Sequence, residues 1–244
     1  MQFGVQLYNF RDYLAKDFKG VLNEIAKIGF DGVEFFSAYH DHSPEDVVAM
    51  LKESGLQCCG TMFGIDALKD KDSTVWNYVK ALNPPAVSTS VMGDFTEKWE
   101  MTRENCKIVA AVAAEKGTRF SYHNHWAEFT LIDGITAMER ILDAPGAEQV
   151  MMEPDICWLT RGKQSPVAFI QKYAKRICQI HFKDIVVPED PETTVPLGKG
   201  CIDLNSVYET AKAINCPWLI YEQDTTTDPF LNAAESLQYL RSLK

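Results

Sequence analysis

Eight short β-rich runs alternate with helical segments along the whole chain, and this alternation constrains the fold more than any other feature. The runs are Phe3–Tyr8, Asp31–Phe36, Leu56–Gly60, Ala86–Ser90, Arg119–His123, Gln149–Glu153, Ile177–His181 and Trp218–Glu222. The first connecting segment carries a stripe with helical spacing, formed by Phe18, Val21, Leu22, Ile25 and Ile28. Strands joined by helices pair in parallel, and eight such units close a barrel of about 250 residues. The pattern therefore predicts an α/β fold, a single-domain (β/α)8 TIM barrel over residues 1–244.

A doubly wound open sheet is the structural competitor. Such a fold would carry a G-x-G-x-x-G turn after its first strand, and none follows Phe3–Tyr8. The longest connection, residues 184–201, follows the seventh run. Because long loops after barrel strands usually serve the active site, this loop is expected at the functional end.

The charge and cysteine content restrict the partners. A net charge of −10 and a pI of about 5.0 argue against nucleic acid, which needs clustered Lys and Arg. No apolar run approaches the roughly 18–20 residues of a membrane span. Seven cysteines without a C-x-x-C pair favour reduced thiols in a cytoplasmic protein, although removal of an export signal is left open.

Histidines and carboxylates follow four consecutive strands at the carboxyl ends, where barrels carry their chemistry. The segments are Tyr122-His123-Asn124-His125 with Glu128 close behind, Glu153-Pro154-Asp155, His181-Phe182-Lys183-Asp184 and Glu222-Gln223-Asp224. Several carboxylates in one cavity repel one another, and a divalent cation removes that cost. Mixed carboxylate and imidazole ligands suit Mn²⁺, Co²⁺, Zn²⁺ or Mg²⁺ without choosing among them.

Each of these residues also has a purely structural interpretation. His123 and His125 would serve equally well in a buried hydrogen-bond network, and Glu128 in a loop cap. Asp155 would cap the next helix, and Lys183 would pair with Glu222 or Asp155. The functional interpretation is favoured, because otherwise a separate structural explanation would be needed at each of four successive strand ends.

Five ordered blocks resemble the sugar phosphate isomerase/epimerase superfamily of xylose isomerase-like barrels. They are Gly4–Asp12, Ile28–Glu34, Glu153–Trp158, His181–Asp184 and Pro196–Gly200. The resemblance covers essentially the whole chain and implies a metal held by an acid ending strand five, with Asp155, His181 and Glu222. At strand five the chain departs from the family's Glu-Asn-His, because it has His123-Asn124-His125. Either His123 or Glu128 is then the fourth ligand, and Glu128 is preferred.

The resemblance also implies roles in catalysis. Glu222 is the expected base, and Glu128 or Glu153 the second acid. His125 and Lys183 would bind hydroxyls or stabilise negative charge. Substrate contacts are expected from the side chains of His123, Tyr8 and Trp158.

The predicted function is that of an isomerase or epimerase that acts on a small sugar or keto-sugar through an enediolate, with one divalent metal ion. Whether the sugar is phosphorylated is left open. The alternatives are a dehydratase that uses the same site on a keto-polyol, and a non-catalytic sugar-binding barrel. Barrels of this kind often form dimers, so a homodimer is also expected.

Overall fold

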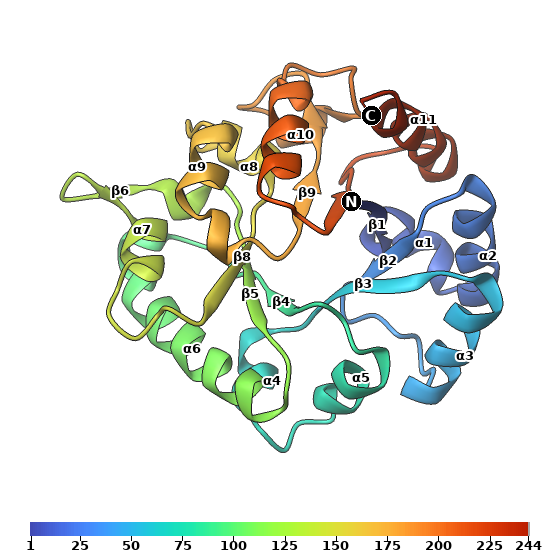
Figure 1. The fold of residues 1–244 in the computed structure, drawn as a ribbon, viewed down its shortest axis with the longest axis horizontal. Helices are drawn as coiled ribbons and strands as arrows, with labels where there is room; N and C mark the ends of the chain where they lie inside the picture. The colour runs from blue at the N-terminus through green and yellow to red at the C-terminus, as the bar shows by residue number, and fades with distance from the viewer. Residues whose placement is uncertain (244) are drawn as a thin grey trace.

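Eight parallel strands form a ring with helices around it (Figure 1). The computed structural model describes residues 1–243. The strands are β1 (Gln2–Gln6), β2 (Gly32–Phe35), β3 (Gln57–Met62), β4 (Val87–Thr89), β5 (Phe120–His123), β8 (Val150–Glu153), β9 (Ile180–Phe182) and β12 (Trp218–Tyr221). Their order in the sheet is β8-β5-β4-β3-β2-β1-β12-β9. Two isolated parallel bridges, Met152 with Ile177 and Asp155 with His181, join the ends of this order and nearly close the barrel. The predicted barrel is confirmed.

Most predicted strands differ from the observed ones by one or two residues. The largest difference is at the seventh strand, predicted from Ile177 and observed from Ile180. The third strand continues to Met62 because its pairing with β4 lies at Thr61 and Met62.

Helices cover the outside of the ring. They are α1 (Arg11–Leu14), α2 (Phe18–Ile28), α3 (Pro44–Ser54), α4 (Ile65–Lys69), α5 (Val75–Leu82), α6 (Phe95–Glu115), α7 (Ala137–Leu142), α8 (Ile156–Arg161), α9 (Pro166–Lys172), α10 (Leu204–Ala213) and α11 (Pro229–Ser242). In the described chain none of them is long and apolar enough to cross a membrane. The α2 stripe predicted from the sequence buries Phe18, Val21, Leu22 and Ile25. Asp17 caps the start of this helix, and Gly29, with φ of 105°, ends it in the left-handed conformation.

Two hairpins lie outside the ring. One, β6 (Leu131–Ile132) with β7 (Ile135–Thr136), projects from the edge of the molecule (Figure 1). The other, β10 (Asp184–Ile185) with β11 (Thr194–Val195), organises the predicted long loop. Asp184 holds that loop because its carboxylate accepts the backbone N–H groups of Gly198 (3.0 Å) and Gly200 (2.8 Å). Asp184 is therefore a loop anchor.

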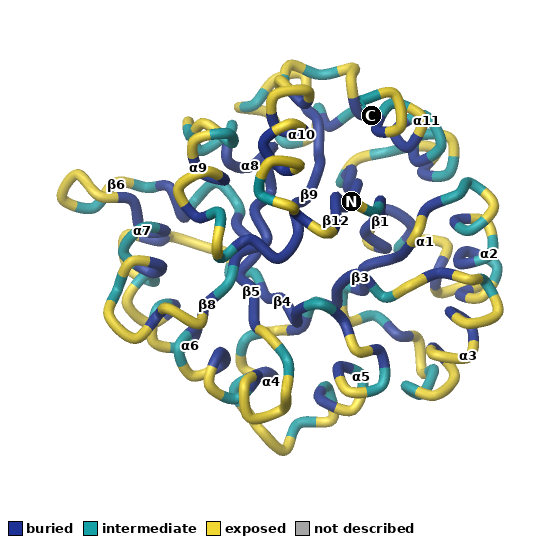
Figure 2. The backbone as a smooth tube through the Cα atoms, viewed as in Figure 1, coloured by how far each residue is buried: buried dark blue, intermediate teal, exposed yellow. Residues whose placement is uncertain are grey.

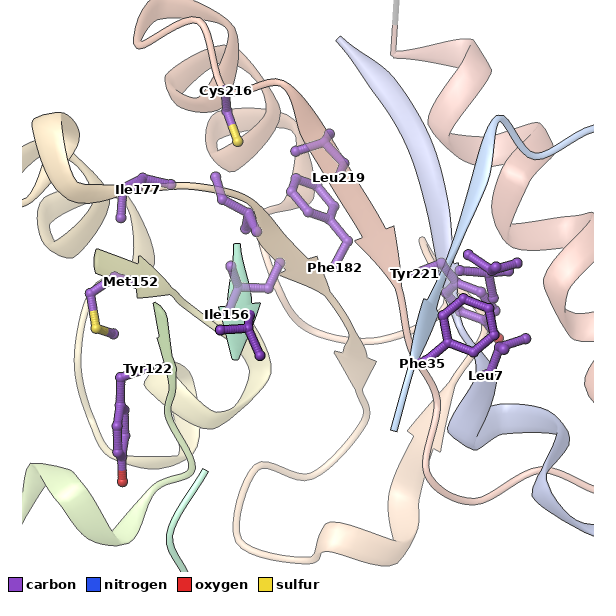
Figure 3. Close-up of a cluster of buried hydrophobic side chains, with 14 of the residues drawn as sticks. Leu7, Phe35, Tyr122, Met152, Ile156, Ile177, Phe182, Cys216, Leu219 and Tyr221 are labelled. Carbon is purple, nitrogen blue, oxygen red and sulfur yellow. The ribbon is translucent and has the colours of Figure 1, made fainter. Parts of the chain in front are cut away.

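The apolar core lies between the strands and the helices. Figure 2 shows the ring buried and the outer faces of the helices exposed. Figure 3 shows part of this core, in which Tyr122, Phe182, Leu219 and Tyr221 from three strands belong to one buried cluster. We call this region the outer layer. The burial pattern of the helices, with one apolar face each, places most of the hydrophobic contacts here.

The inside of the ring is different in composition. A small apolar cluster of Cys59, Trp218 and Ile220 fills part of it. The interior polar layer, as we call it, consists of buried side chains that bond across the barrel: Gln6, Glu34, Ser88, Ser121, Glu153, Gln179 and His181. Strands β2 and β9 are not neighbours in the sheet, yet Gln179, the residue before β9, donates from Nε2 to Glu34 Oε1 of β2 at 2.9 Å. Such a bond is possible only through the interior.

Candidate metal centre

Four buried side chains meet at the carboxyl ends of the strands. His123 ends β5, Asp155 follows β8, His181 lies in β9 and Glu222 follows β12. Each offers one ligand atom, and these four atoms lie within 4.8 Å of one another. Two carboxylates and two imidazoles within this distance form a donor set that suits a divalent transition metal such as Zn²⁺, Co²⁺ or Mn²⁺.

Asp155 shows why the chain brings a carboxylate to this point. Its Oδ1 caps helix α8 by accepting the backbone N–H groups of Cys157 (2.8 Å) and Trp158 (3.1 Å). Its Oδ2 is buried and has no hydrogen-bond partner of good geometry, although the Lys183 ammonium lies 3.0 Å away. One oxygen is thus fixed by the helix while the other stays available to a cation, so the residue fits a metal ligand.

Asn124 joins the two strand ends that carry His123 and Asp155. Its Oδ1 accepts the backbone N–H of Asp155 at 3.1 Å, and its Nδ2 donates to the Asp155 carbonyl at 3.3 Å. No role was predicted for Asn124 from the sequence. The sequence feature that could have identified it is its position between two histidines at a strand end.

Lys183 supplies the positive charge of the site. Its Nζ lies 3.0 Å from Asp155 Oδ2, 2.8 Å from Glu222 Oε2 and 2.9 Å from Asp224 Oδ2. Burial alone would lower the pKa of Lys183, but the carboxylates of Asp155, Asp224 and Glu222 raise it well above its usual range. Burial would likewise raise the pKa of Glu222, but Lys183 and His181 hold it well below its usual range. The two groups are therefore an ion pair at neutral pH.

His181 lies between two groups of carboxylates. Its Nδ1 is 3.0 Å from Glu222 Oε2, and its Nε2 is 2.5 Å from Glu34 Oε2 and 3.0 Å from Glu153 Oε1. Burial would lower the pKa of this imidazole, but Glu34 and Glu153 raise it well above its usual range. One ring nitrogen faces the metal centre and the other faces the interior polar layer.

A cavity of about 470 Å³ opens beside the centre. Its polar side includes His123, His125, Lys183, Glu222 and Asp224. Its apolar lining comes from Tyr8, Phe36, Met62, Phe63 and Met92. A cavity of this size with a few converging polar groups is typical of a site for a small ligand.

A profile of the xylose isomerase-like TIM barrels matches residues 22–243. The chain belongs to this family. It is 24% identical over 271 residues to inosose dehydratase from Klebsiella pneumoniae, a comparison that covers 92% of the chain and 89% of the relative. A sugar phosphate isomerase/epimerase from Parabacteroides distasonis superposes with a TM-score of 0.82 at 19% identity, covering 99% and 94% of the two chains. The IolI protein, described with a bound zinc atom, superposes with a TM-score of 0.77 at 15% identity, covering 100% and 96%.

The resemblance stated from the sequence is confirmed by these comparisons. The family's named relatives are enzymes, so the expectation of an enzyme is confirmed as well. A buried His/Asp/Glu cluster that suits a metal is present here, and IolI is a similar barrel described with a bound zinc atom.

The structure brings together most of the residues that the sequence singled out for this site. Asp155, His181 and Glu222 meet, and His123 joins them. Tyr8, His123, His125 and Lys183 line the cavity. Trp158 does not line it but lies buried behind it, with its ring centroid 6.1 Å from that of His125 and 4.6 Å from Lys183 Nζ.

Glu128 lies elsewhere than expected. Its Oε1 accepts the hydroxyl of Tyr122 at 3.0 Å and the backbone N–H of His125 at 3.1 Å, and the residue is fully buried. Side chains alternate along β5, so Tyr122 faces the outer layer while His123 faces the centre. Glu128 follows Tyr122 to the outer side, and His123 takes the fourth position at the centre.

Glu153 was expected to act as a second acid. It is fully buried in the interior polar layer and does not line the cavity. Two acids received no role from the sequence. Glu34 lies within strand β2, and Asp224 lines the cavity two residues after Glu222.

Proposed function

We propose that this protein is a divalent-metal-dependent isomerase or epimerase of a small, unphosphorylated keto-sugar. The observation that carries the proposal is the buried group of His123, Asp155, His181 and Glu222 opening into the 470 Å³ cavity. We assign the metal to these four residues. When bound, a divalent ion would supply Lewis-acid polarisation of a substrate carbonyl.

Glu222 is the proposed base. It lines the cavity, and Lys183 and His181 keep it ionised. It takes the proton from the carbon next to the substrate carbonyl, and the electron pair moves onto the carbonyl oxygen to give an enediolate. Return of the proton to the neighbouring carbon completes an isomerisation.

Epimerisation needs a proton from the opposite face of the substrate. Asp224 is the second carboxylate that lines the cavity, and Lys183 holds it at 2.9 Å. We assign the second acid to Asp224, because neither Glu128 nor Glu153 lines the cavity. His125 and Lys183 then bind hydroxyls and stabilise the enediolate oxygens.

The charges of the site support a neutral substrate. Among the described residues that line the cavity, Lys183 is the one Lys or Arg, and three carboxylates already surround it. With a divalent ion present, the charges of Asp155, Glu222, Asp224 and Lys183 balance to zero. A phosphate dianion would find no uncompensated positive charge here. The apolar side of the cavity suits the C–H face of a sugar ring.

A dehydratase is the second candidate, and the similarity to inosose dehydratase over 92% of the chain favours it. The first step would be the same proton abstraction. The enediolate would then expel a β-hydroxyl as water instead of regaining a proton, which gives an unsaturated ketone.

One experiment separates these functions. The protein, loaded with Mn²⁺, Co²⁺ or Zn²⁺, is incubated in D₂O with a cyclic keto-polyol and with an open-chain ketose. Deuterium beside the carbonyl without ultraviolet absorption supports the isomerase or epimerase. Growth of an enone absorption supports the dehydratase. Absence of exchange with either compound, together with no metal uptake, would leave only a sugar-binding barrel.

We also propose a compartment and an oligomeric state for this enzyme. All seven cysteines are free, which supports a reducing compartment, and we place the protein in the cytoplasm. A homodimer stays a prediction that measurement of the mass in solution would test.

A further inference from the structure

Two carboxylates lie below the metal centre and take no part in the proposed reaction. Glu34 and Glu153 are fully buried, and neither lines the cavity. With His181 they form a second group whose ligand atoms lie within 4.8 Å of one another. Burying two acids lowers the free energy of unfolding unless they are paired. Their arrangement therefore calls for a functional explanation.

Neutral donors fix both carboxylates in place. Gln6 Nε2 donates to Glu34 Oε2 at 2.8 Å, and Gln179 Nε2 donates to Glu34 Oε1 at 2.9 Å. Gln179 also donates to Glu153 Oε2, and the Ser88 hydroxyl donates to the same oxygen at 2.5 Å. Because these donors come from the interior polar layer, the acids cannot turn away from the imidazoles above them.

The remaining acceptor positions point at the two histidines of the centre. Glu34 Oε2 lies 2.5 Å from His181 Nε2, and Glu153 Oε1 lies 3.0 Å from the same nitrogen. Glu153 Oε1 also lies 3.3 Å from His123 Nδ1, without hydrogen-bond geometry. On the side away from the cavity, His181 therefore has two acids beside Nε2, whereas its Nδ1 lies 3.0 Å from Glu222, one of the four residues of the metal centre.

We propose that Glu34 is a positioning residue that keeps a proton on Nε2 of His181, with Glu153 as a second acid beside the same nitrogen. An imidazole that binds a metal through one nitrogen keeps its N–H on the other, and a carboxylate beside that other nitrogen favours this arrangement. Nδ1 of His181, which faces Glu222, is then left with a free lone pair for a metal. The inference rests on the metal centre of the proposed function and adds two residues to it.

A purely structural role for Glu34 is the competing explanation, and metal affinity distinguishes the two. Glu34→Gln keeps the size of the side chain but replaces the carboxyl group with an amide that can turn its NH₂ group toward His181. Binding of Zn²⁺ and of Co²⁺ is measured by competition with a chelator for wild type, Glu34→Gln, Glu128→Gln and His181→Ala. Glu128 is the matched control, because it is an equally buried acid outside the centre.

We expect Glu34→Gln to bind metal about 10–100-fold more weakly, which is the usual effect of removing such a partner. Glu128→Gln should bind like wild type, and His181→Ala should not bind measurably. Wild-type affinity in Glu34→Gln, with binding lost in His181→Ala, would overturn the inference and leave the metal centre intact. No binding in wild type would overturn both the inference and the proposed function.

A measurement on the wild type covers the case in which Glu34→Gln does not fold. In ¹⁵N-histidine-labelled protein loaded with Zn²⁺, long-range ¹H–¹⁵N spectra show which nitrogen of each imidazole carries the proton. The signals of His181 are assigned by their loss in His181→Ala. A proton on Nε2 of His181 supports the inference, and metal on Nε2 contradicts it.

Discussion

The two sides of the barrel wall differ in kind although they are built from the same strands. The outer layer is apolar, with Phe120 and Tyr122 of β5 buried against helices. The next residues of that strand, Ser121 and His123, face the interior and join polar networks. Barrel interiors are commonly filled by Val, Ile and Leu, so a polar interior is a departure from the usual packing.

The outer layer contributes mainly to stability, and the interior polar layer contributes mainly to function. The outer layer removes large apolar side chains from water and supplies most of the free energy of folding. The interior polar layer removes charged groups from water, which stabilises a fold weakly or not at all. A set of buried acids and imidazoles that does little for stability is best explained by the chemistry of the site above it.

Adjacent residues of β9 give the largest expected contrast. Phe182 is fully buried in the outer layer, and His181 is fully buried on the interior side. Phe182→Ala should lower the free energy of unfolding by about 3–5 kcal/mol through the cavity it leaves. The folded fraction of that variant should keep its metal. His181→Ala should lose both metal and activity, because it removes a ligand. Denaturant unfolding and elemental analysis of both variants test this, and equal metal loss in the two would remove the distinction between the layers.

The same contrast explains what the sequence could predict. The outer layer follows the helical period directly, and the α2 stripe buries four of its five predicted residues. Asp155, His181 and Glu222 were visible because they follow strands, where barrels place their ligands. Glu34 was not, because it lies inside the short strand β2, where sequence alone does not show which face is polar.

Glu128 shows the second limit of sequence reasoning. Its distance along the chain from His123 suggested a ligand, but proximity in sequence does not show which side of the wall a loop residue reaches. Only the bonds from Tyr122 and from the His125 N–H place it on the outer side.

The pH dependence of stability tests whether the Glu128 carboxyl is buried. Burial raises the pKa of this carboxyl from 4.5 to about 7. Between these values the folded protein holds a proton that the unfolded chain has lost, so this group's stabilising contribution disappears as the pH rises. Glu128→Gln should remove that slope, which amounts to about 3 kcal/mol between roughly pH 5 and pH 8. Denaturant unfolding across this range measures it, with the exposed Glu209→Gln as the control. An unchanged slope in Glu128→Gln would mean that the carboxyl is not buried as described.

The smallest expected effect concerns the link between the ends of β5 and β8. Asn124 holds the end of β5 to the backbone of Asp155 through two hydrogen bonds. Asn124→Ala should lower the free energy of unfolding by about 1–3 kcal/mol, because it leaves the buried backbone N–H of Asp155 unpaired. It should also weaken metal binding, since His123 and Asp155 lose their fixed spacing. Asn205→Ala, on the exposed face of α10, is the matched control and should change neither quantity. Lower stability with unchanged metal affinity would show that the strand ends keep their spacing without Asn124, and that the centre is held from the interior polar layer alone.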